Sequence, residues 1–479
     1  MTKNSIEAKI AKLYASHIGS APQQIIPMAA HGSDRRYYRV LDNGHSTIGV
    51  YNHDRRENQA FLHFSQVFRS AELPVPEIFA QDIEQGVYLE QDLGDITLFS
   101  FLTDIRKNDG FSDRIVSIYE KVVTLLPQFQ IAASKNLDYR LCYPRASFDK
   151  QSMMWDLNYF KYYFLKLAKI TFDEQYLEDD FKKFTDFLLQ AERDFFLYRD
   201  FQSRNVMIND GEPYFIDYQG GRKGALQYDI ASLLFDAKAD IPQEVRDHLL
   251  EKYIESVNKH IPVDRESFMQ FYYGYVLIRI MQALGAYGFR GFYERKGHFL
   301  RSVPYAIQNL EWLLRTARLP VELPALTEAW GKLVRSSYLR QIGDVELQLT
   351  VRLQSFSFRR GIPIDEKGHG GGFVFDCRLL PNPGRLPEYA ELTGNDTEVI
   401  DYLQRELEVT EYVSHIKAIV DQAIKNYQSR NFTDLMISFG CTGGQHRSVY
   451  MTNLIEGYLK SKKGIHIEKR HRELEFMKR

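Results

Sequence analysis

The chain has 479 residues, a length that suggests two to three domains. Hydrophobic residues make up 44% and charged residues 26%, which are ordinary values for a protein with a large buried core. The formal net charge of −2 gives no global attraction to nucleic acid or anionic membrane, so a basic site has to be local. The three cysteines, Cys142, Cys377 and Cys441, are widely spaced, which argues against a disulfide framework or a zinc site and favours a reducing compartment. No signal peptide and no run of membrane-spanning length is found, so we expect a cytoplasmic protein without a membrane partner.

The N-terminal part combines helices with short strands. Apolar residues recur at helical spacing from Ile6 to Ile18. Strands are predicted from Tyr37 to Leu41 and from Ser46 to Tyr51, joined by a turn at residues 42–44. Before them lies a small polar turn with Ser33, Arg35 and Arg36, whose backbone N–H groups and guanidinium groups suit nucleotide phosphates. A solvated hairpin tip is the alternative for this turn.

A predicted helix beginning at Glu57 and a strand from Val87 follow. The strand runs into the turn at residues 94–95, whose backbone groups are candidates for binding adenine. We therefore group Gln91, Asp92 and Leu93 with Glu57 in a predicted nucleotide site. Beyond them the pattern is mainly helical, with helices expected over 115–133, 153–167, 179–195 and from Gln227, so the organisation is α+β and two-lobed.

Residues 198–219 contain a predicted β-hairpin, with the apolar strands 206–208 and 214–216 joined by Asn-Asp-Gly. Asp200 and Asn205 precede the first strand and Asp217 follows the second, so all three side chains are expected at one end of the hairpin. The spacing Arg-Asp-x-x-x-x-Asn followed by a strand-borne Asp is typical of a kinase catalytic loop. It predicts Asp200 as the base that deprotonates a hydroxyl, with Asn205 and Asp217 binding Mg²⁺ on the phosphates. An acidic turn with solvated carboxylates is the weaker alternative.

A proline-punctuated stretch at residues 319–324 marks a boundary. We predict a first domain over 1–318, a linker over 319–346 that includes a helix from Thr327 to Tyr338, and a smaller α/β domain over 347–479. In the last domain, strands are expected over 347–358, 372–380 and 435–439, and helices over 397–405, 411–427 and 449–460.

The last of these strands leads into a glycine-rich loop. Strand, loop and helix form an anion-binding design, because glycines turn backbone N–H groups inward and the helix contributes the positive end of its dipole. The predicted anion site comprises Cys441, Thr442, Gly443, Gly444, Gln445, His446, Arg447 and Ser448. The spacing Cys-x5-Arg is also that of tyrosine phosphatases, where the cysteine is a thiolate nucleophile, and an ordinary glycine-rich turn is the third alternative.

The first two-thirds of the chain, about residues 20 to 315, resembles the aminoglycoside phosphotransferase/choline kinase superfamily, and within it the cell-wall-recycling amino-sugar kinases of the AmgK type. The motifs that carry the resemblance are Gly-Ser-Asp-Arg-Arg-Tyr-Tyr-Arg-Val from Gly32, Val-Pro-Glu-Ile-Phe-Ala-Gln-Asp from Val75, Leu-Glu-Gln-Asp-Leu-Gly-Asp from Leu89, the catalytic stretch, Tyr-Asp-Ile-Ala-Ser-Leu-Leu from Tyr228, and residues 281–304. The resemblance implies a protein-kinase-like fold, ATP and Mg²⁺ as cofactors, phosphorylation of N-acetylmuramate or N-acetylglucosamine at the anomeric hydroxyl, and a helix-capping role for Asp229. The chain departs from the pattern in two places: residues 46–51 contain no lysine, for which Arg35 or Arg36 would substitute, and Gln202 stands where histidine is frequent.

Almost all of residues 350 to 475 are similar to the C-terminal domain of the RapZ family. The motifs are Ser-Phe-Arg-Arg-Gly-Ile-Pro from Ser357, Phe-Asp-Cys-Arg-Leu-Leu-Pro-Asn-Pro from Phe375, Leu-Thr-Gly from Leu392, and the glycine loop. The resemblance implies a domain that senses glucosamine-6-phosphate and binds small regulatory RNA. The family's usual P-loop domain is absent from this sequence, and the AmgK-like domain stands in its place.

The C-terminal tail is rich in lysine and arginine, and we name Lys462, Lys463, Lys469 and Arg470 as an RNA-binding candidate. A solvated helical face is the alternative. Taken together, the motifs and the two resemblances predict an ATP-dependent amino-sugar kinase joined to a sugar-phosphate-sensing domain. The sequence is compatible with an oligomeric protein. The competing hypothesis is a non-catalytic pseudokinase scaffold that acts as an RNA-binding regulator.

Overall fold

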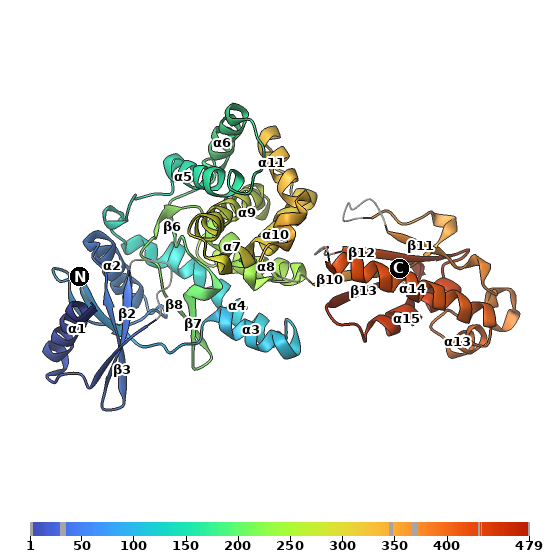
Figure 1. The fold of residues 1–479 in the computed structure, drawn as a ribbon, viewed down its shortest axis with the longest axis horizontal. Helices are drawn as coiled ribbons and strands as arrows, with labels where there is room; N and C mark the ends of the chain where they lie inside the picture. Colours follow the sequence, from blue (N-terminus) through green and yellow to red (C-terminus); the bar gives the residue numbers. More distant parts are fainter. Residues whose placement is uncertain are drawn as a thin grey trace. The chain divides into compact units, whose positions relative to one another are not determined.

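The computed structural model describes residues 3–28, 35–343, 348–365, 372–429, 432 and 434–477. The chain divides into two compact units, one of Met1–Arg295 with Ala317–Gly331 and the other of Lys296–Thr316 with Lys332–Arg479 (Figure 1). This division differs from the predicted limits at 318 and 347. Much of the predicted linker is helical, in α11 (Pro324–Arg335) and α12 (Ser337–Gln341). Within the described residues, no helix is both long and apolar enough to span a bilayer.

The N-terminal part of the first unit is a five-stranded antiparallel sheet in the order β1-β2-β3-β5-β4. Its elements are α1 (Lys3–Ile18), β1 (Gln24–Pro27), β2 (Arg36–Asp42), β3 (His45–Tyr51), α2 (Arg55–Ser70), β4 (Ile78–Asp82) and β5 (Val87–Gln91). Residues alternate between the two faces of a strand, so Tyr38 and Val40 of β2 are buried in a cluster with Ile6 and Ile10 of α1. The neighbouring Tyr37 belongs to the opposite face of this strand.

The larger part of the first unit is helical and carries two small two-stranded sheets, β6–β9 and β7–β8. The elements are α3 (Leu98–Asp109), α4 (Asp113–Pro127), α5 (Lys150–Phe160), α6 (Glu174–Leu188), β6 (Phe195–Leu197), β7 (Val206–Asn209), β8 (Glu212–Phe215), β9 (Arg222–Gly224), α7 (Gln227–Leu234), α8 (Gln243–Val257) and α9 (Arg265–Gly288). Helices α5 and α9 pack very closely, since a Cβ atom on Gly285 of α9 would lie 3.0 Å from the backbone nitrogen of Phe160 at the end of α5. This contact anchors α5, which borders the candidate active site.

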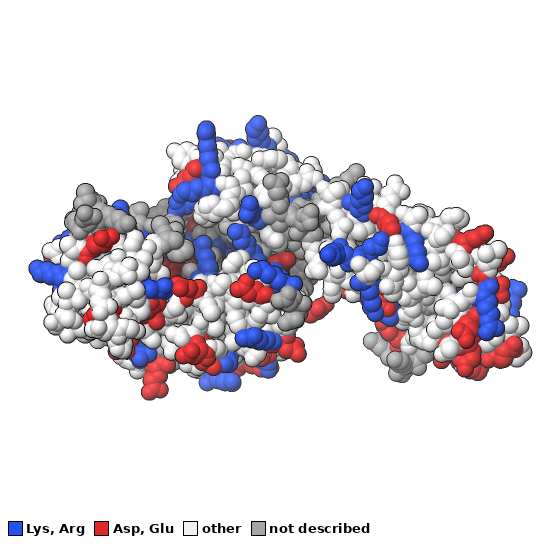
Figure 2. All heavy atoms as spheres, turned by 60° about the horizontal axis from the view of Figure 1, so that its bottom comes forward, with Lys and Arg blue, Asp and Glu red and all other residues white. Residues whose placement is uncertain are grey.

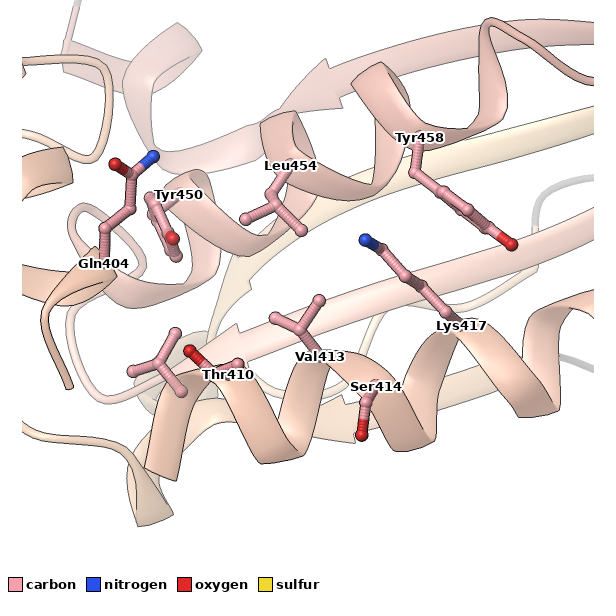
Figure 3. Close-up of a pocket in the computed structure, with 9 residues that line it drawn as sticks. Gln404, Thr410, Val413, Ser414, Lys417, Tyr450, Leu454 and Tyr458 are labelled. Atoms are coloured by element: carbon pink, nitrogen blue, oxygen red, sulfur yellow. The ribbon is translucent and has the colours of Figure 1, made fainter. Parts of the chain in front are cut away.

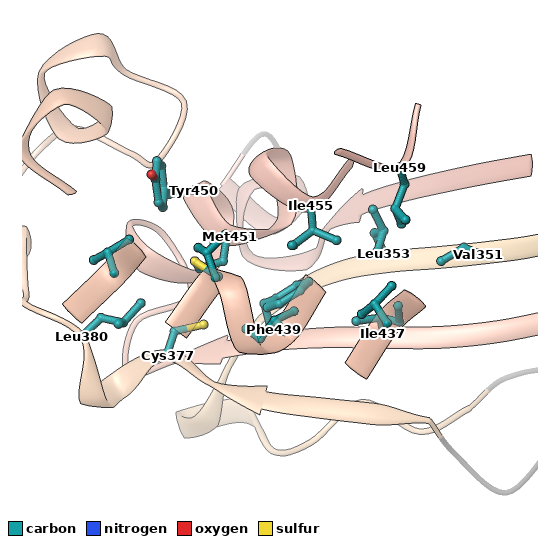
Figure 4. Close-up of a cluster of buried hydrophobic side chains, with 14 of the residues drawn as sticks. Val351, Leu353, Cys377, Leu380, Ile437, Phe439, Tyr450, Met451, Ile455 and Leu459 are labelled. Atoms are coloured by element: carbon teal, nitrogen blue, oxygen red, sulfur yellow. The ribbon is translucent and has the colours of Figure 1, made fainter. Parts of the chain in front are cut away.

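The second unit is built on a four-stranded sheet in the order β11-β12-β10-β13, with all three strand pairs parallel. Its elements are α10 (Val303–Thr316), α12, β10 (Leu349–Ser357), β11 (Phe373–Asp376), α13 (Thr397–Gln404), α14 (Leu407–Ser429), β12 (Asp434–Cys441), α15 (Arg447–Leu459), β13 (Ile465–His471) and α16 (Arg472–Met477). Apolar side chains of the central strands and of α15 form one core, seen in Figure 4. Helix α10 also belongs to this unit, and its Glu311 pairs with Arg340 of α12 at 2.6 Å.

The two-lobed α+β class of the first domain and the smaller α/β class of the last are both confirmed. Several elements differ from the expectation. The predicted helix over 179–195 begins earlier and ends at Leu188, and Phe195 starts strand β6. The tail that we compared with a helical face contains strand β13, and strands β1, β4, β6 and β9 were not predicted.

Candidate active site

The hairpin of β7 and β8 is closed by a tight turn. Asp210 and Gly211 both have positive φ angles, 51° and 80°, as a two-residue turn of the left-handed type requires. The register pairs Val206 with Phe215 and Asn209 with Glu212. Asn205 and Asp217 therefore lie at the same end of the hairpin.

The three predicted polar side chains are brought together there. The side-chain nitrogen Nδ2 of Asn205 donates to Asp217 Oδ2 and to the backbone carbonyl of Asp200, both at 2.8 Å. Gln219 Nε2 donates to the other Asp217 oxygen at 2.8 Å. These bonds turn the Asn205 nitrogen inward and leave its carbonyl oxygen as the group that can coordinate a cation.

The carboxyl group of Asp217 has a raised pKa of about 6. Burial is the main cause and the charge of Asp200 adds to it, while Gln219 and Arg35 act in the opposite direction. A cation at this position would remove the repulsion between the two carboxylates. Carboxylate and amide oxygens are hard ligands of the kind Mg²⁺ prefers, so the donor set fits this ion.

The loop that carries Asp200 is held by a buried carboxylate from α7. Asp229 is fully buried and accepts hydrogen bonds from the backbone N–H groups of Tyr198 (2.8 Å) and Arg199 (3.0 Å). Burial raises the pKa of Asp229 to about 7. Arg199 has a φ of 84°, in the left-handed region, so the loop is strained at the residue before Asp200 and depends on these bonds.

Arg35 and Arg36, two of the residues predicted to cover the nucleotide phosphates, differ in burial. Arg35 is 2% exposed, its Nε lies 3.4 Å from Glu57 Oε1 of α2, and its Nη1 donates to the Tyr88 hydroxyl at 2.9 Å. Arg36 is exposed at the start of β2. Ser33 lies outside the described residues. Of the two arginines, Arg35 is therefore the one that joins the α2 glutamate, and its charge acts to lower the pKa of the Asp217 carboxyl.

The predicted adenine-binding segment follows β5. Asp92 is not free to bind a nucleotide through its side chain, because its carboxylate pairs with Arg39 at 2.7 Å and also accepts from Ser46 and from the N–H of Gly94. Gln91 continues the sheet, with its N–H donating to the Glu77 carbonyl at 2.8 Å. Beyond Leu93, the chain pairs with the hairpin through the bond from Ile208 N to Ile96 O at 2.8 Å, which fixes this segment against the catalytic hairpin.

In the second unit, the predicted anion loop runs from the end of β12 to the start of α15. Thr442 and Gly443 are exposed, whereas Gly444, Arg447 and Ser448 are buried. Gly444 has a φ of 73°, and a Cβ atom there would lie 2.3 Å from Glu473 Cγ, so only glycine fits. Arg447 Nη1 donates to the backbone carbonyls of Arg378 (3.0 Å) and Leu380 (2.9 Å), which commits this arm of the guanidinium to the fold.

Two other loop members are also engaged. His446 Nε2 lies 2.9 Å from the Tyr389 carbonyl oxygen. Cys441 is 3% exposed, and its Sγ lies 3.2 Å from Ser448 Oγ and accepts from the Gly444 N–H at 3.2 Å. A sulfur atom enclosed in this way is poorly placed to attack a phosphoester, so the geometry favours anion binding over phosphatase chemistry.

A separate groove of about 430 Å³ lies between α14 and α15 (Figure 3). Val413 and Lys417 of α14 face Leu454 and Tyr458 of α15 across it. Lys417 Nζ lies 4.7 Å from the centre of the Tyr458 ring. None of the predicted loop residues lines this groove, so it is distinct from the predicted anion site.

The basic tail residues are largely engaged with acidic neighbours. Lys462 pairs with Asp421 (2.9 Å), Lys469 with Glu456 (2.8 Å) and Arg470 with Glu475 (2.8 Å). Lys463 forms no ion pair with any described residue. Figure 2 shows lysine and arginine side chains interspersed with acidic ones over the visible face of the molecule.

Three charged residues around the catalytic loop and the neighbouring Tyr228 were missed by the sequence reasoning. Asp156 of α5 pairs with Arg199 at 2.7 Å, Arg222 opens β9, and Arg279 lies on α9. They come from segments far apart in the chain. Asp156 and Arg279 each stand in an apolar stretch, which is a signal that could have pointed to them, whereas Arg222 stands between glycines and Lys223 and has no such signal.

Comparison with known proteins matches both parts of the chain. A family model described as "Phosphotransferase enzyme family" matches residues 25–266, and one described as "RapZ C-terminal domain" matches residues 349–475. Curated relatives include a "Nucleotide-binding protein" of Thermotoga neapolitana, 39% identical over 144 residues (30% of this chain and 48% of the relative), and the "RNase adapter protein RapZ" of Yersinia pseudotuberculosis, 38% identical over 136 residues (28% and 46%). The chain thus spans about half the length of the curated relatives it matches.

Among solved structures, similar chains include the amicoumacin kinase hAmiN in complex with AMP-PNP and Ca²⁺, at 13% identity and a TM-score of 0.45, covering 72% of this chain and 94% of that one. Another is an ethanolamine kinase of Plasmodium vivax, at 13% identity and a TM-score of 0.43, covering 60% of this chain and 81% of that one.

Proposed function

Since the chain belongs to the phosphotransferase enzyme family and also carries a RapZ C-terminal domain, we propose that it is an ATP- and Mg²⁺-dependent amino-sugar kinase of the AmgK type, joined to a sugar-phosphate-sensing domain. Its acceptor is N-acetylmuramate or N-acetylglucosamine, phosphorylated at the anomeric hydroxyl during cell-wall recycling in the cytoplasm. The observation that carries the proposal is the convergence of Asp200, Asn205 and Asp217 at one end of the hairpin.

In this mechanism the Asp200 carboxylate accepts the proton of the sugar hydroxyl as the hydroxyl oxygen attacks the γ-phosphorus of ATP. The bond from the γ-phosphorus to the β,γ-bridging oxygen breaks, and ADP leaves. Asn205 and Asp217 would hold Mg²⁺, which when bound neutralises charge on the phosphates. Arg35, oriented by Glu57 at 3.4 Å, supplies the cation that a strand lysine provides in many kinases. Backbone groups near Gln91 to Leu93 hold adenine. Ser33 and Arg36 are the other residues proposed for the phosphates, and the exposed Arg36 adds only a weak, solvent-screened attraction.

For the C-terminal domain, we propose that the loop from Cys441 to Ser448 binds glucosamine-6-phosphate and modulates the kinase. Its exposed members, Thr442 and Gly443, precede the N-terminus of α15, where backbone N–H groups favour a phosphate. Small RNA is the second proposed partner of this domain.

The alternative of a non-catalytic scaffold rests on the lack of lysine in β3. The pairing of Arg35 with Glu57 weighs against it, because a buried guanidinium already occupies the place beside the α2 glutamate.

The experiment that tests the proposal is ³¹P NMR of the full chain with ATP, Mg²⁺ and, in separate samples, N-acetylmuramate, N-acetylglucosamine, glucosamine and choline. A new anomeric phosphate signal is the expected result. No turnover of any sugar, with glucosamine-6-phosphate still bound, would favour the scaffold instead.

A further inference from the structure

A buried arginine beside the candidate base lacks a carboxylate partner. Arg222, the first residue of β9, is 7% exposed. Its Nε donates to the Gly220 carbonyl at 3.0 Å and its Nη2 makes a long contact of 3.4 Å with the Tyr143 carbonyl. Among the described residues, no carboxylate lies within ion-pair distance of it, and its Nη1 has no acceptor but is not fully enclosed, so a ligand can reach it. A buried guanidinium bonded only to neutral groups is costly unless an anion joins it.

The position of Arg222 links it to Asp200. A Cβ atom on Gly220, the residue whose carbonyl accepts from Arg222, would lie 3.9 Å from Asp200 Oδ2. The charged and titratable groups that act most on Arg222 are Arg199, Tyr228, Asp156 and Asp200. Arg199 and Asp156 already neutralise each other through two bonds of 2.8 and 2.7 Å, so their pair leaves nothing for Arg222.

A second buried arginine lies near the same tyrosine. Arg279 is 5% exposed, acts electrostatically on Tyr228, and is bonded to the neutral groups Ser232 Oγ (2.8 Å) and Gln282. Two buried guanidinium groups that are bonded only to neutral groups, those of Arg222 and Arg279, thus interact electrostatically with Tyr228.

The nucleotide is proposed to lie beside Arg35 and Asp217. The acidic groups that act on Arg222 are Asp156 of α5 and Asp200. Asp156 pairs with Arg199 at 2.7 Å, so α5 borders the loop that carries Asp200. We therefore expect the acceptor between α5 and Asp200.

We propose that Arg222 binds a carboxylate carried by the acceptor and so selects an acidic sugar over its neutral counterpart. The inference rests on the proposed function and deepens it. A planar guanidinium pairs with a carboxylate through two parallel hydrogen bonds, an arrangement that a neutral substituent cannot provide. N-acetylmuramate and N-acetylglucosamine differ by a lactyl group that bears a carboxylate, so the two sugars isolate this contact.

The test is isothermal titration of the full chain with N-acetylmuramate and with N-acetylglucosamine, for the wild type, Arg222→Gln and Arg222→Lys. We expect the wild type to bind N-acetylmuramate more tightly, and Arg222→Gln to reduce that preference by about 10- to 100-fold, as loss of a charged hydrogen bond implies. Arg222→Lys should restore part of the preference. The matched control is Arg140→Gln, which removes the same charge from a 90% exposed side chain paired with Asp138 and should leave the preference unchanged.

The proposal is overturned if the wild type binds N-acetylglucosamine at least as tightly as N-acetylmuramate, or if it binds neither sugar. It is also overturned if Arg222→Gln weakens binding of both sugars equally, or weakens binding of neither. Phosphate transfer is scored separately by ³¹P NMR. Transfer to both sugars with a preference insensitive to Arg222 would refute the role of Arg222 while the kinase proposal stood.

Discussion

The guanidinium of Arg35 lies 3.4 Å from the carboxylate of Glu57. Arg35 directly precedes β2, and Glu57 lies in the first turn of α2. Arg35 is also within 5.1 Å of the Phe61 ring centre and is almost completely buried. Its charge acts on Asp217, so one cation connects the helix glutamate with the end of the catalytic hairpin. The strand β3 therefore needs no lysine for this purpose.

The first prediction concerns the two neighbouring arginines. Arg35→Met should weaken ATP binding by about tenfold or more, because a charged hydrogen bond in a desolvated site is lost. Arg36→Met, at the exposed neighbouring position, should change it by less than about threefold. Nucleotide titration calorimetry measures both, and Arg35→Lys shows whether charge alone restores binding. The assignment fails if a folded Arg35→Met protein binds ATP as the wild type does, or if Arg36→Met is the more damaging change.

The second prediction concerns the base. Asp200→Asn should lower kcat by about 10²- to 10⁴-fold, because the amide cannot accept the hydroxyl proton. The matched control is Asp210→Asn in the exposed hairpin turn, where the positive φ of 51° is tolerated by asparagine. Steady-state phosphorylation of whichever sugar is turned over provides the measurement. Equal rates for Asp200→Asn and wild type would exclude Asp200 as the base.

The hairpin that holds these residues was predictable because its information is local. Asn-Asp-Gly between two apolar runs specifies the turn, and the turn specifies which side chains share an end. Asp156 and Arg222 reach Arg199 and Asp200 only through tertiary packing of α5 and β9, and no local pattern encodes that proximity. Strand β13 was not predicted for a different reason. It lies at the edge of its sheet and carries several charged residues, as exposed edge strands commonly do. These charges obscure the alternation of the apolar residues Ile465 and Ile467.

The third prediction is a pH dependence of cation binding. The pKa of Asp217 is raised to about 6 by burial and by the charge of Asp200, so this carboxylate, the proposed Mg²⁺ ligand, is fully ionised only above about pH 7. Since its folded pKa exceeds the unfolded value of 3.8, its contribution to the free energy of unfolding is present at low pH and is lost as the pH rises through 6. Mg²⁺ should therefore raise the Tm at pH 8 and much less at pH 5, in a thermal-shift titration.

The control for this experiment is Asp217→Asn, in which the Mg²⁺ response should be weak at both pH values. A Mg²⁺-induced rise in Tm that is the same at pH 5 and pH 8 in the wild type would show that Asp217 does not control the cation site.

The last prediction concerns the basic tail. Lys463 has no ion pair among the described residues, whereas Lys469 pairs with Glu456 at 2.8 Å. Removing the charge of Lys463 weakens attraction to a phosphate backbone. Removing the charge of Lys469 does the same and also leaves the Glu456 carboxylate unneutralised, so that it repels the phosphates. If structured RNA binds here, Lys463→Gln should reduce the slope of log K against log salt by about one, and Lys469→Gln should weaken binding at least as much. Filter binding at several salt concentrations measures this, with Lys425→Gln on α14 as the control of equal charge change. Affinity and salt slope unchanged in both tail variants would exclude the tail as an RNA site.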